Sequence, residues 1–206
     1  TANVLAGAST NVGVTAASAG SLADTLALTL TSNANGVADL ANANLTAGAI
    51  AVTGAAYDLA RADFGATAVA FGNVRTGALR QVAVTNTVAT LAAFQDSLDA
   101  TATTGLATLS VASPANLAAG ASGNVTVTAA KAGALDGAVS VALASNTNGV
   151  LGLTGVGLTA QSLAITGAAY DLASPVYATT KSLGNNRVGE GSTLTIANTV
   201  ITAAGY

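Results

Sequence analysis

The residues in this chain whose type and spacing could do chemistry are two aspartates, Asp58 and Asp171, which recur in identical surroundings. Hard cations such as Ca²⁺ bind several oxygens from carboxylates, amides and backbone carbonyls. No Asp-x-Asp run or glycine-rich calcium loop adjoins either aspartate. The favoured interpretation is a turn-forming aspartate whose side chain bonds the local backbone. Ca²⁺ at Asp58 and Asp171 is the alternative, and no other cofactor is expected.

Nucleophilic and metal-assisted catalysis lack their usual residues. The chain contains no histidine and no cysteine, which excludes Ser-His-Asp triads, Cys-His pairs and histidine-built metal sites. A Ser-Lys pair would need Lys131 or Lys181, and no Ser-x-x-Lys motif precedes either lysine. Only one of the nine acidic residues is a glutamate. We therefore expect no enzyme activity and no catalytic residues.

Two tyrosines precede these aspartates and share their repetition. Tyr57 and Tyr170 stand in a chain that has three Phe, four Tyr and no Trp. A repeated tyrosine in such a chain is expected to plug a core or a junction, with its hydroxyl reaching a backbone partner. Pro175 follows the second tyrosine and would stiffen a linker there. We assign Tyr57, Asp58, Tyr170, Asp171 and Pro175 to junctions or assembly contacts.

The surrounding sequence is an internal repeat, which decides the architecture. Residues 54–60 read Gly-Ala-Ala-Tyr-Asp-Leu-Ala and return unchanged at 167–173, an offset of 113 residues. Past the tyrosine the offset falls to 112, because a loop tolerates a deletion. The predicted division is 1–60 as the back part of a first repeat, 64–173 as a complete repeat, and 177–206 as the front strands of a further repeat.

Alternation of apolar and polar residues predicts strands along each repeat. Residues 11–17 and 124–130 alternate at valines, and residues 26–31 and 139–145 alternate at leucines and valines. The second pair of segments is followed by Asn-x-Asn-Gly, and Asn-Gly is the strongest short hairpin signal. About seven short strands in each 112–113-residue repeat predict an all-β fold of tandem Ig-like antiparallel β-sandwich modules.

The charge content of the chain limits its partners. Only 7% of the residues are charged, and the net charge is −3. Six lysines and arginines, scattered along the chain, do not form the basic patch that nucleic acid requires. No run of 18 apolar residues occurs, so no transmembrane segment is expected. Threonine, serine and asparagine must solvate the surface, and such a surface favours packing against copies of itself.

A family resemblance rests on Phe71–Gly77, which reads Phe-Gly-Asn-Val-Arg-Thr-Gly, and on Val-Ala-Val-Thr-Asn-Thr-Val at 82–88. These segments resemble the opening of a bacterial Ig-like repeat, similar to the ASPM-SPD-2-Hydin-like modules and the choice-of-anchor D surface proteins. The next copy departs from the pattern, with Leu183 in place of Phe71 and Asn186 in place of Val74. The resemblance implies an Ig-like sandwich, export and tandem arrays, and it brings no catalytic residues.

These features predict a structural protein, extracellular or attached to the bacterial cell surface. It is expected to self-associate by packing and strand pairing into a filament, a stalk or a surface layer of the S-layer kind. The alternative is a repetitive adhesin module that binds a glycan or a host protein. Residues 177–206 of one chain could complete residues 1–60 of the next, although counterparts of residues 95–113 would be missing. Equally, the 206 residues could be a window on a longer array.

Overall fold

The computed structural model describes residues 4–202 and 205–206. Residues 1–3 and 203–204, which belong to the first and last predicted repeat parts, lie outside the described residues. Within the described ranges the chain is all-β, and its one helical element is a 3₁₀ turn, η1 (Ala92–Phe94).

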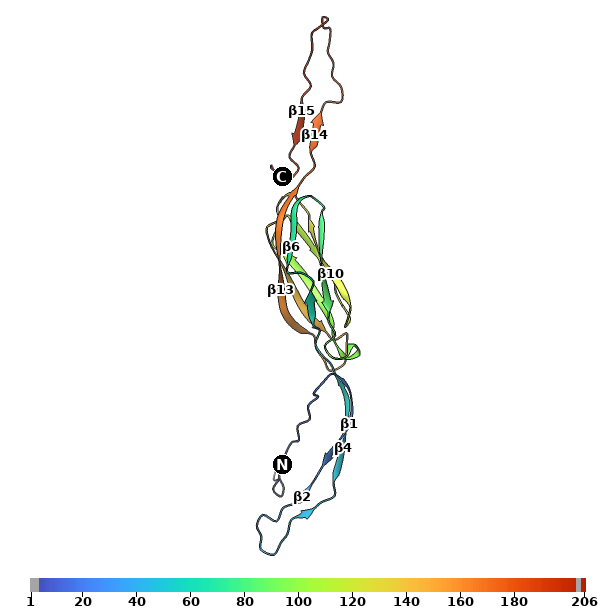
Figure 1. Ribbon diagram of the computed structural model, residues 1–206, viewed down its shortest axis with the longest axis vertical. Coiled ribbons are helices and arrows are strands. Elements are labelled where there is room, and N and C mark those ends of the chain that lie inside the picture. The colour runs from blue at the N-terminus through green and yellow to red at the C-terminus, as the bar shows by residue number, and fades with distance from the viewer. Residues whose placement is uncertain (1–3, 203–204) are drawn as a thin grey trace.

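Figure 1 shows a body of packed strands with a hairpin arm at each end, so that the molecule is elongated. We refer to residues 4–56 as the N-terminal arm, to residues 57–173 as the central unit, and to residues 174–206 as the C-terminal arm. The arms extend from opposite ends of the central unit.

Two sheets form the central unit. The first sheet is antiparallel and runs in the order β5 (Ala62–Phe64), β7 (Leu79–Asn86), β10 (Ser122–Ala129), β9 (Leu109–Ala112). The second sheet runs in the order β11 (Gly133–Ala134), β13 (Val156–Tyr170), β12 (Gly137–Asn146), β8 (Ser97–Thr104). An additional strand, β6 (Ala68–Arg75), pairs with β13 in parallel.

The parallel ladder makes the second sheet mixed, so the expectation of purely antiparallel sheets is wrong at β6. Its neighbours in sequence, β5 and β7, both belong to the first sheet. The chain therefore leaves the first sheet for one strand and then returns, and on that excursion it runs in the same direction as β13.

Alternation buries one face of each sheet. In β10, Val125, Val127 and Ala129 are fully buried, and the residues between them are partly exposed. Val139 and Val141 of β12 are buried in the same way in the other sheet. The buried residues of both sheets form one apolar cluster. Because full burial of a valine side chain contributes roughly 1.5–3 kcal/mol, this cluster holds the sheets together although bulky residues are few.

A fully buried asparagine, Asn86, ends β7. Its Oδ1 accepts hydrogen bonds from Arg61 N and Gln95 Nε2, both at 2.9 Å. Its Nδ2 donates to the carbonyl oxygens of Asp96 at 2.9 Å and Leu117 at 3.0 Å. An unsatisfied buried polar group costs about 1–3 kcal/mol. The complete set of bonds therefore fixes three separate segments to the end of β7.

The arms are built from antiparallel pairs. The N-terminal arm contains β1 (Gly20–Leu28) paired with β4 (Gly48–Ala56), and β2 (Thr31–Ser32) paired with β3 (Ala43–Asn44). The C-terminal arm contains β14 (Ser174–Tyr177) paired with β15 (Ile196–Thr199).

The strand predicted at residues 11–17 is not formed. Its counterpart in the central unit, β10, pairs with β7 on one side and β9 on the other. No strand is paired with residues 11–17 in the described part of the chain, so their backbone groups have no ladder to join. The alternating pattern at 11–17 thus favours a strand with one buried face, but such a strand forms only beside a partner strand.

Candidate functional site

The first predicted junction lies where the N-terminal arm meets the central unit. The rings of Tyr57 and Phe94 pack with centroids 5.5 Å apart and planes tilted by 53°. Beside them, Asp58 N donates to Phe94 O at 2.8 Å, and Asp96 N donates to Asp58 O at 3.0 Å. These bonds form a short parallel bridge between Asp58 and Gln95. Ring packing by the tyrosine and main-chain hydrogen bonds of the aspartate therefore attach the end of the arm to η1.

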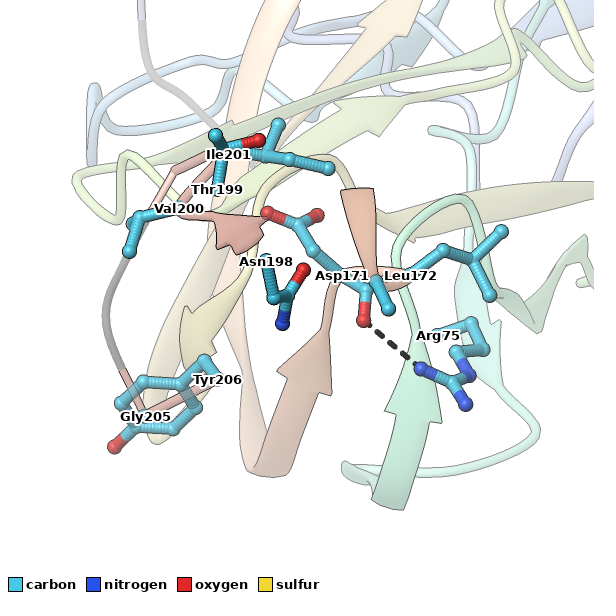
Figure 2. A pocket seen from close by; sticks show the side chains of 10 residues that line it. Arg75, Asp171, Leu172, Asn198, Thr199, Val200, Ile201, Gly205 and Tyr206 are labelled. Carbon is cyan, nitrogen blue, oxygen red and sulfur yellow. Dashed lines mark hydrogen bonds between the residues drawn. The ribbon is translucent and has the colours of Figure 1, made fainter. Parts of the chain in front are cut away.

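The second predicted junction repeats this ring packing between the central unit and the C-terminal arm. The rings of Tyr170 and Tyr206 have centroids 5.6 Å apart. Figure 2 shows the surrounding cleft, where the Arg75 guanidinium donates to the carbonyl oxygen of Asp171 at 2.9 Å. The Thr202 hydroxyl donates to the Asp171 carboxylate. The cleft has a volume of about 330 Å³.

Pro175 lies inside a strand rather than in a linker. It belongs to β14, where it stands opposite Asn198. A proline has no backbone N–H to donate, so it is tolerated on edge strands. In this position Pro175 fixes the start of the C-terminal arm's hairpin.

The two aspartates do not gather a metal-binding set. In the described ranges no group of three or more His, Cys, Asp or Glu residues could hold a metal ion. The Oδ2 atom of Asp58 is buried and has no hydrogen-bond partner there. Asp171 is occupied by the hydroxyl of Thr202. Main-chain bonds therefore tie the junction at Asp58, whereas both the carbonyl oxygen and the carboxylate of Asp171 take part at the second junction.

The N-terminal arm reproduces the pairing of a hairpin in the central unit. β1 and β4 pair in the register that β11, β12 and β13 use, with every residue displaced by 113 positions. The one-residue register shift inside β12–β13 also recurs between the β1–β4 and β2–β3 ladders. Matched pairs are Leu26–Ile50 with Val139–Leu163, Gly20–Ala56 with Gly133–Ala169, and Thr31–Asn44 with Ala144–Gly157.

The loops of these two hairpins agree as well. Asn35 and Gly36 have φ of 52° and 78°, and Asn148 and Gly149 have φ of 51° and 79°. Asparagine and glycine tolerate this left-handed conformation. The Asn-Gly turns predicted from the sequence are therefore confirmed in both copies.

The C-terminal arm reproduces the pairing of β5 with β7. Matched pairs are Pro175–Asn198 with Ala62–Asn86, and Tyr177–Ile196 with Phe64–Val84. The side-chain bonds recur too. Ser174 N donates to Asn198 Oδ1 at 2.8 Å, as Arg61 N donates to Asn86 Oδ1 at 2.9 Å. The arm therefore forms one of the four side-chain hydrogen bonds that fix Asn86 in the central unit.

Each arm has the pairings that its own residues can make and lacks those that need the other arm. In the central unit, β7 pairs with β10 and β6 pairs with β13. The counterparts of these two pairings would join the C-terminal arm to the N-terminal arm. Figure 1 shows the two arms at opposite ends, so neither pairing forms within the described chain.

The missing pairings leave apolar faces open to solvent. The Ile50 side chain is 49% exposed, whereas its counterpart Leu163 is fully buried. Ile196 is 68% exposed, whereas its counterpart Val84 is fully buried. Further exposed apolar residues on the arms are Val12, Val14, Leu30, Tyr177, Leu183 and Leu194. Residues at core positions of the repeat are thus exposed on the arms.

Sequence reasoning missed the partners of the two tyrosines. Phe94 and Tyr206 are equivalent in the repeat, and each packs on the tyrosine at the end of the preceding copy. The signal was present, because aromatic residues are rare in this chain and these four recur in pairs at nearly the same separation.

Comparisons with known proteins yield no family assignment: no family model matches the chain, and no curated protein matches it. In the part of the chain that the structure describes, no helix is long and apolar enough to cross a membrane.

Proposed function

We propose that this chain is a structural protein of the extracellular space or the bacterial cell surface. Its Ig-like repeats self-associate by packing and strand pairing into a filament, a stalk or a surface layer. The observation that carries the proposal is the pair of arms, which keep the register of the central unit while their core faces stay exposed.

The surface chemistry supports the same proposal. Few residues are charged, so copies approach one another with little electrostatic repulsion. An unpaired strand edge is a template for pairing with another chain, and β1, which pairs with β4 on one side, presents such an edge on the other. A function by association needs no reactive residues, in keeping with the lack of histidine and cysteine.

The test compares two variants of one strand by sedimentation velocity over a dilution series. Ile50→Asp places a charge on the apolar face of β4, whose counterpart Leu163 is buried. Ala51→Asp places the same charge on the opposite face, whose counterpart Ala164 is exposed. We expect the association constant to fall about tenfold or more for Ile50→Asp, since each 1.4 kcal/mol is tenfold, and to change little for Ala51→Asp.

Electron microscopy of the associated material gives the second readout. Regular fibres or sheets built from elongated units would support the proposal. Particles that stay monomeric at every concentration and ionic strength would contradict it. Capture of such monomers by specific glycans would favour an adhesin instead.

A further inference from the structure

The central unit contains its own template for how two arms fit together. Its front part, residues 61–94, meets its back part, residues 114–170, through the β7–β10 and β6–β13 ladders. The C-terminal arm corresponds to the front part and the N-terminal arm to the back part. The interface proposed between the arms is therefore one that equivalent residues already form within the central unit.

The template specifies which residues would face each other. In β7–β10, Val82 stands opposite Val125 and Thr85 stands opposite Ser122. Residues of the front part correspond to residues 112 positions later in the C-terminal arm, and residues of the back part to residues 113 positions earlier in the N-terminal arm. The equivalent pairs are therefore Leu194 opposite Val12 and Ala197 opposite Ser9. Each pair keeps its character, because the first is apolar and inward-facing and the second is small and outward-facing.

The apolar faces of the two arms complement each other. Ile196 and Leu194 replace Val84 and Val82 on the front side, and the back side offers Val12, Val14, Leu26, Ile50 and Val52. Every central counterpart of these residues is buried. Since burial of such a side chain stabilises by roughly 1.5–3 kcal/mol, the faces have a strong drive to cover each other.

The charges of the arms favour unlike arms over like ones. The N-terminal arm carries Asp24 and Asp39 and no basic residue. The C-terminal arm carries Lys181, Arg187 and Glu190 and is therefore net positive by one charge. Opposite signs steer an N-terminal arm toward a C-terminal arm.

We infer that the C-terminal arm of one molecule docks on the N-terminal arm of a second copy of this chain. Residues 191–198 extend into a strand beside residues 9–16, in the register of β7–β10, and residues 181–187 lie beside β4, in the register of β6–β13. This inference rests on the proposed function, because it names the joint through which the copies associate. The two arms of one molecule cannot meet, since they lie at opposite ends.

Residues 95–113, which form β8 and β9 in the central unit, have no counterpart within either arm. Those strands lie at one edge, where β8 pairs with β12 and β9 pairs with β10. Neither takes part in the two ladders that join front to back. The joint itself therefore does not depend on them.

The experiment exploits the absence of cysteine. Two chains, one carrying Ser9→Cys and the other Ala197→Cys, are mixed in a glutathione redox buffer and analysed by non-reducing gel with distinct tags. In the template, the side chains of Thr85 and Ser122 touch, with Oγ atoms 2.7 Å apart. The mixed disulfide is expected to exceed either homodimer about a hundredfold, because docking raises the local thiol concentration to about the millimolar range.

A register control uses Thr193→Cys in place of Ala197→Cys. Thr193 corresponds to Gln81, which stands opposite Thr126 rather than Ser122. The mixed disulfide between Ser9→Cys and Thr193→Cys is expected to be scarce. Equal yields for positions 193 and 197, or homodimers as abundant as the mixed disulfide, would overturn the inferred joint while leaving self-association standing.

A second measurement works on cysteine-free protein. Ile196→Asp and Thr195→Asp alter adjacent residues, whose counterparts Val84 and Ala83 are buried and exposed respectively. Both residues are exposed in the isolated chain, so we expect both variants to keep the fold of the monomer, which circular dichroism checks. Association should weaken at least about tenfold for Ile196→Asp only. Unchanged association of Ile196→Asp would overturn the joint, and a wild-type chain that never associates would overturn the proposed function as well.

Discussion

The central unit and the two arms are built from equivalent sequence, yet only the central unit buries its apolar face. Their hairpin registers are the same residue for residue. What differs is the set of ladders that connect distant segments, β7–β10 and β6–β13. Short-range pairing needs little loop closure, whereas distant segments carry a greater entropic cost. Strand register in this protein is therefore set by residues close in sequence, whereas burial of the apolar face requires segments that are distant in sequence.

The largest expected difference concerns matched core positions. Leu163→Ala should lower the free energy of unfolding by about 3 kcal/mol, because it empties a fully buried site. Ile50→Ala, at the equivalent and half-exposed position, should cost under about 0.5 kcal/mol. Urea unfolding at a concentration below association measures both. Equal costs would mean that the N-terminal arm is already covered in the monomer.

The second largest difference in stability is expected between Asn86 and Asn198, which are equivalent in the repeat. Asn86→Ala removes a side chain that makes four hydrogen bonds in the core and should cost about 2 kcal/mol. Asn198→Ala removes a single solvent-exposed bond to Ser174 and should cost about 0.5 kcal/mol or less. Thermal unfolding of the two variants provides the measurement. If assembled material restored a large cost to Asn198→Ala, the arm would have gained its buried partners.

A glycine pair should show a smaller contrast. Gly167 and Gly54 have φ of 136° and 147°, so both positions strain any other residue. A Cβ on Gly167 would lie 2.5 Å from the carbonyl oxygen of Gly72, whereas a Cβ on Gly54 meets only Leu22, at 4.0 Å. Gly167→Ala should therefore cost about 1 kcal/mol more than Gly54→Ala in urea unfolding. No difference would indicate that β6 shifts away from β13 easily.

The smallest effect concerns the two aromatic pairs at the junctions. Double-mutant cycles on Tyr57 with Phe94, and on Tyr170 with Tyr206, should each give a coupling of about 0.5–1 kcal/mol. The expected values are similar because the ring separations are 5.5 Å and 5.6 Å. A coupling at one junction alone would show that the two aromatic pairs differ in solution.

The sequence predicted the local features of the fold and missed those that depend on distant partners. Alternation at 124–130 and 139–145 found β10 and β12, and the two Asn-Gly turns were placed correctly. The same alternation failed at 11–17, because a strand requires a neighbour that the described chain does not supply. The parallel course of β6 was also missed, since the direction of a partner strand leaves no mark on apolar periodicity.

The candidate site divides in the same way. Repetition alone was enough to single out Tyr57, Asp58, Tyr170 and Asp171. Their role in main-chain bonding and ring packing required the approach of η1 and of Tyr206, which lie far along the chain. Pro175 was expected in a linker and lies in β14, because the strand begins sooner after the junction than composition suggests.

The parallel ladder between β6 and β13 determines how the molecule would respond to force. A load applied through the two arms pulls the start of β6 toward one end and the finish of β13 toward the other. The strands must then slide past each other, so their hydrogen bonds are loaded together in shear instead of breaking one at a time as in a zipper. Forced unfolding is governed by the unfolding rate, and shear raises the barrier that sets this rate. A chain of such units would resist stretching even though each core is small.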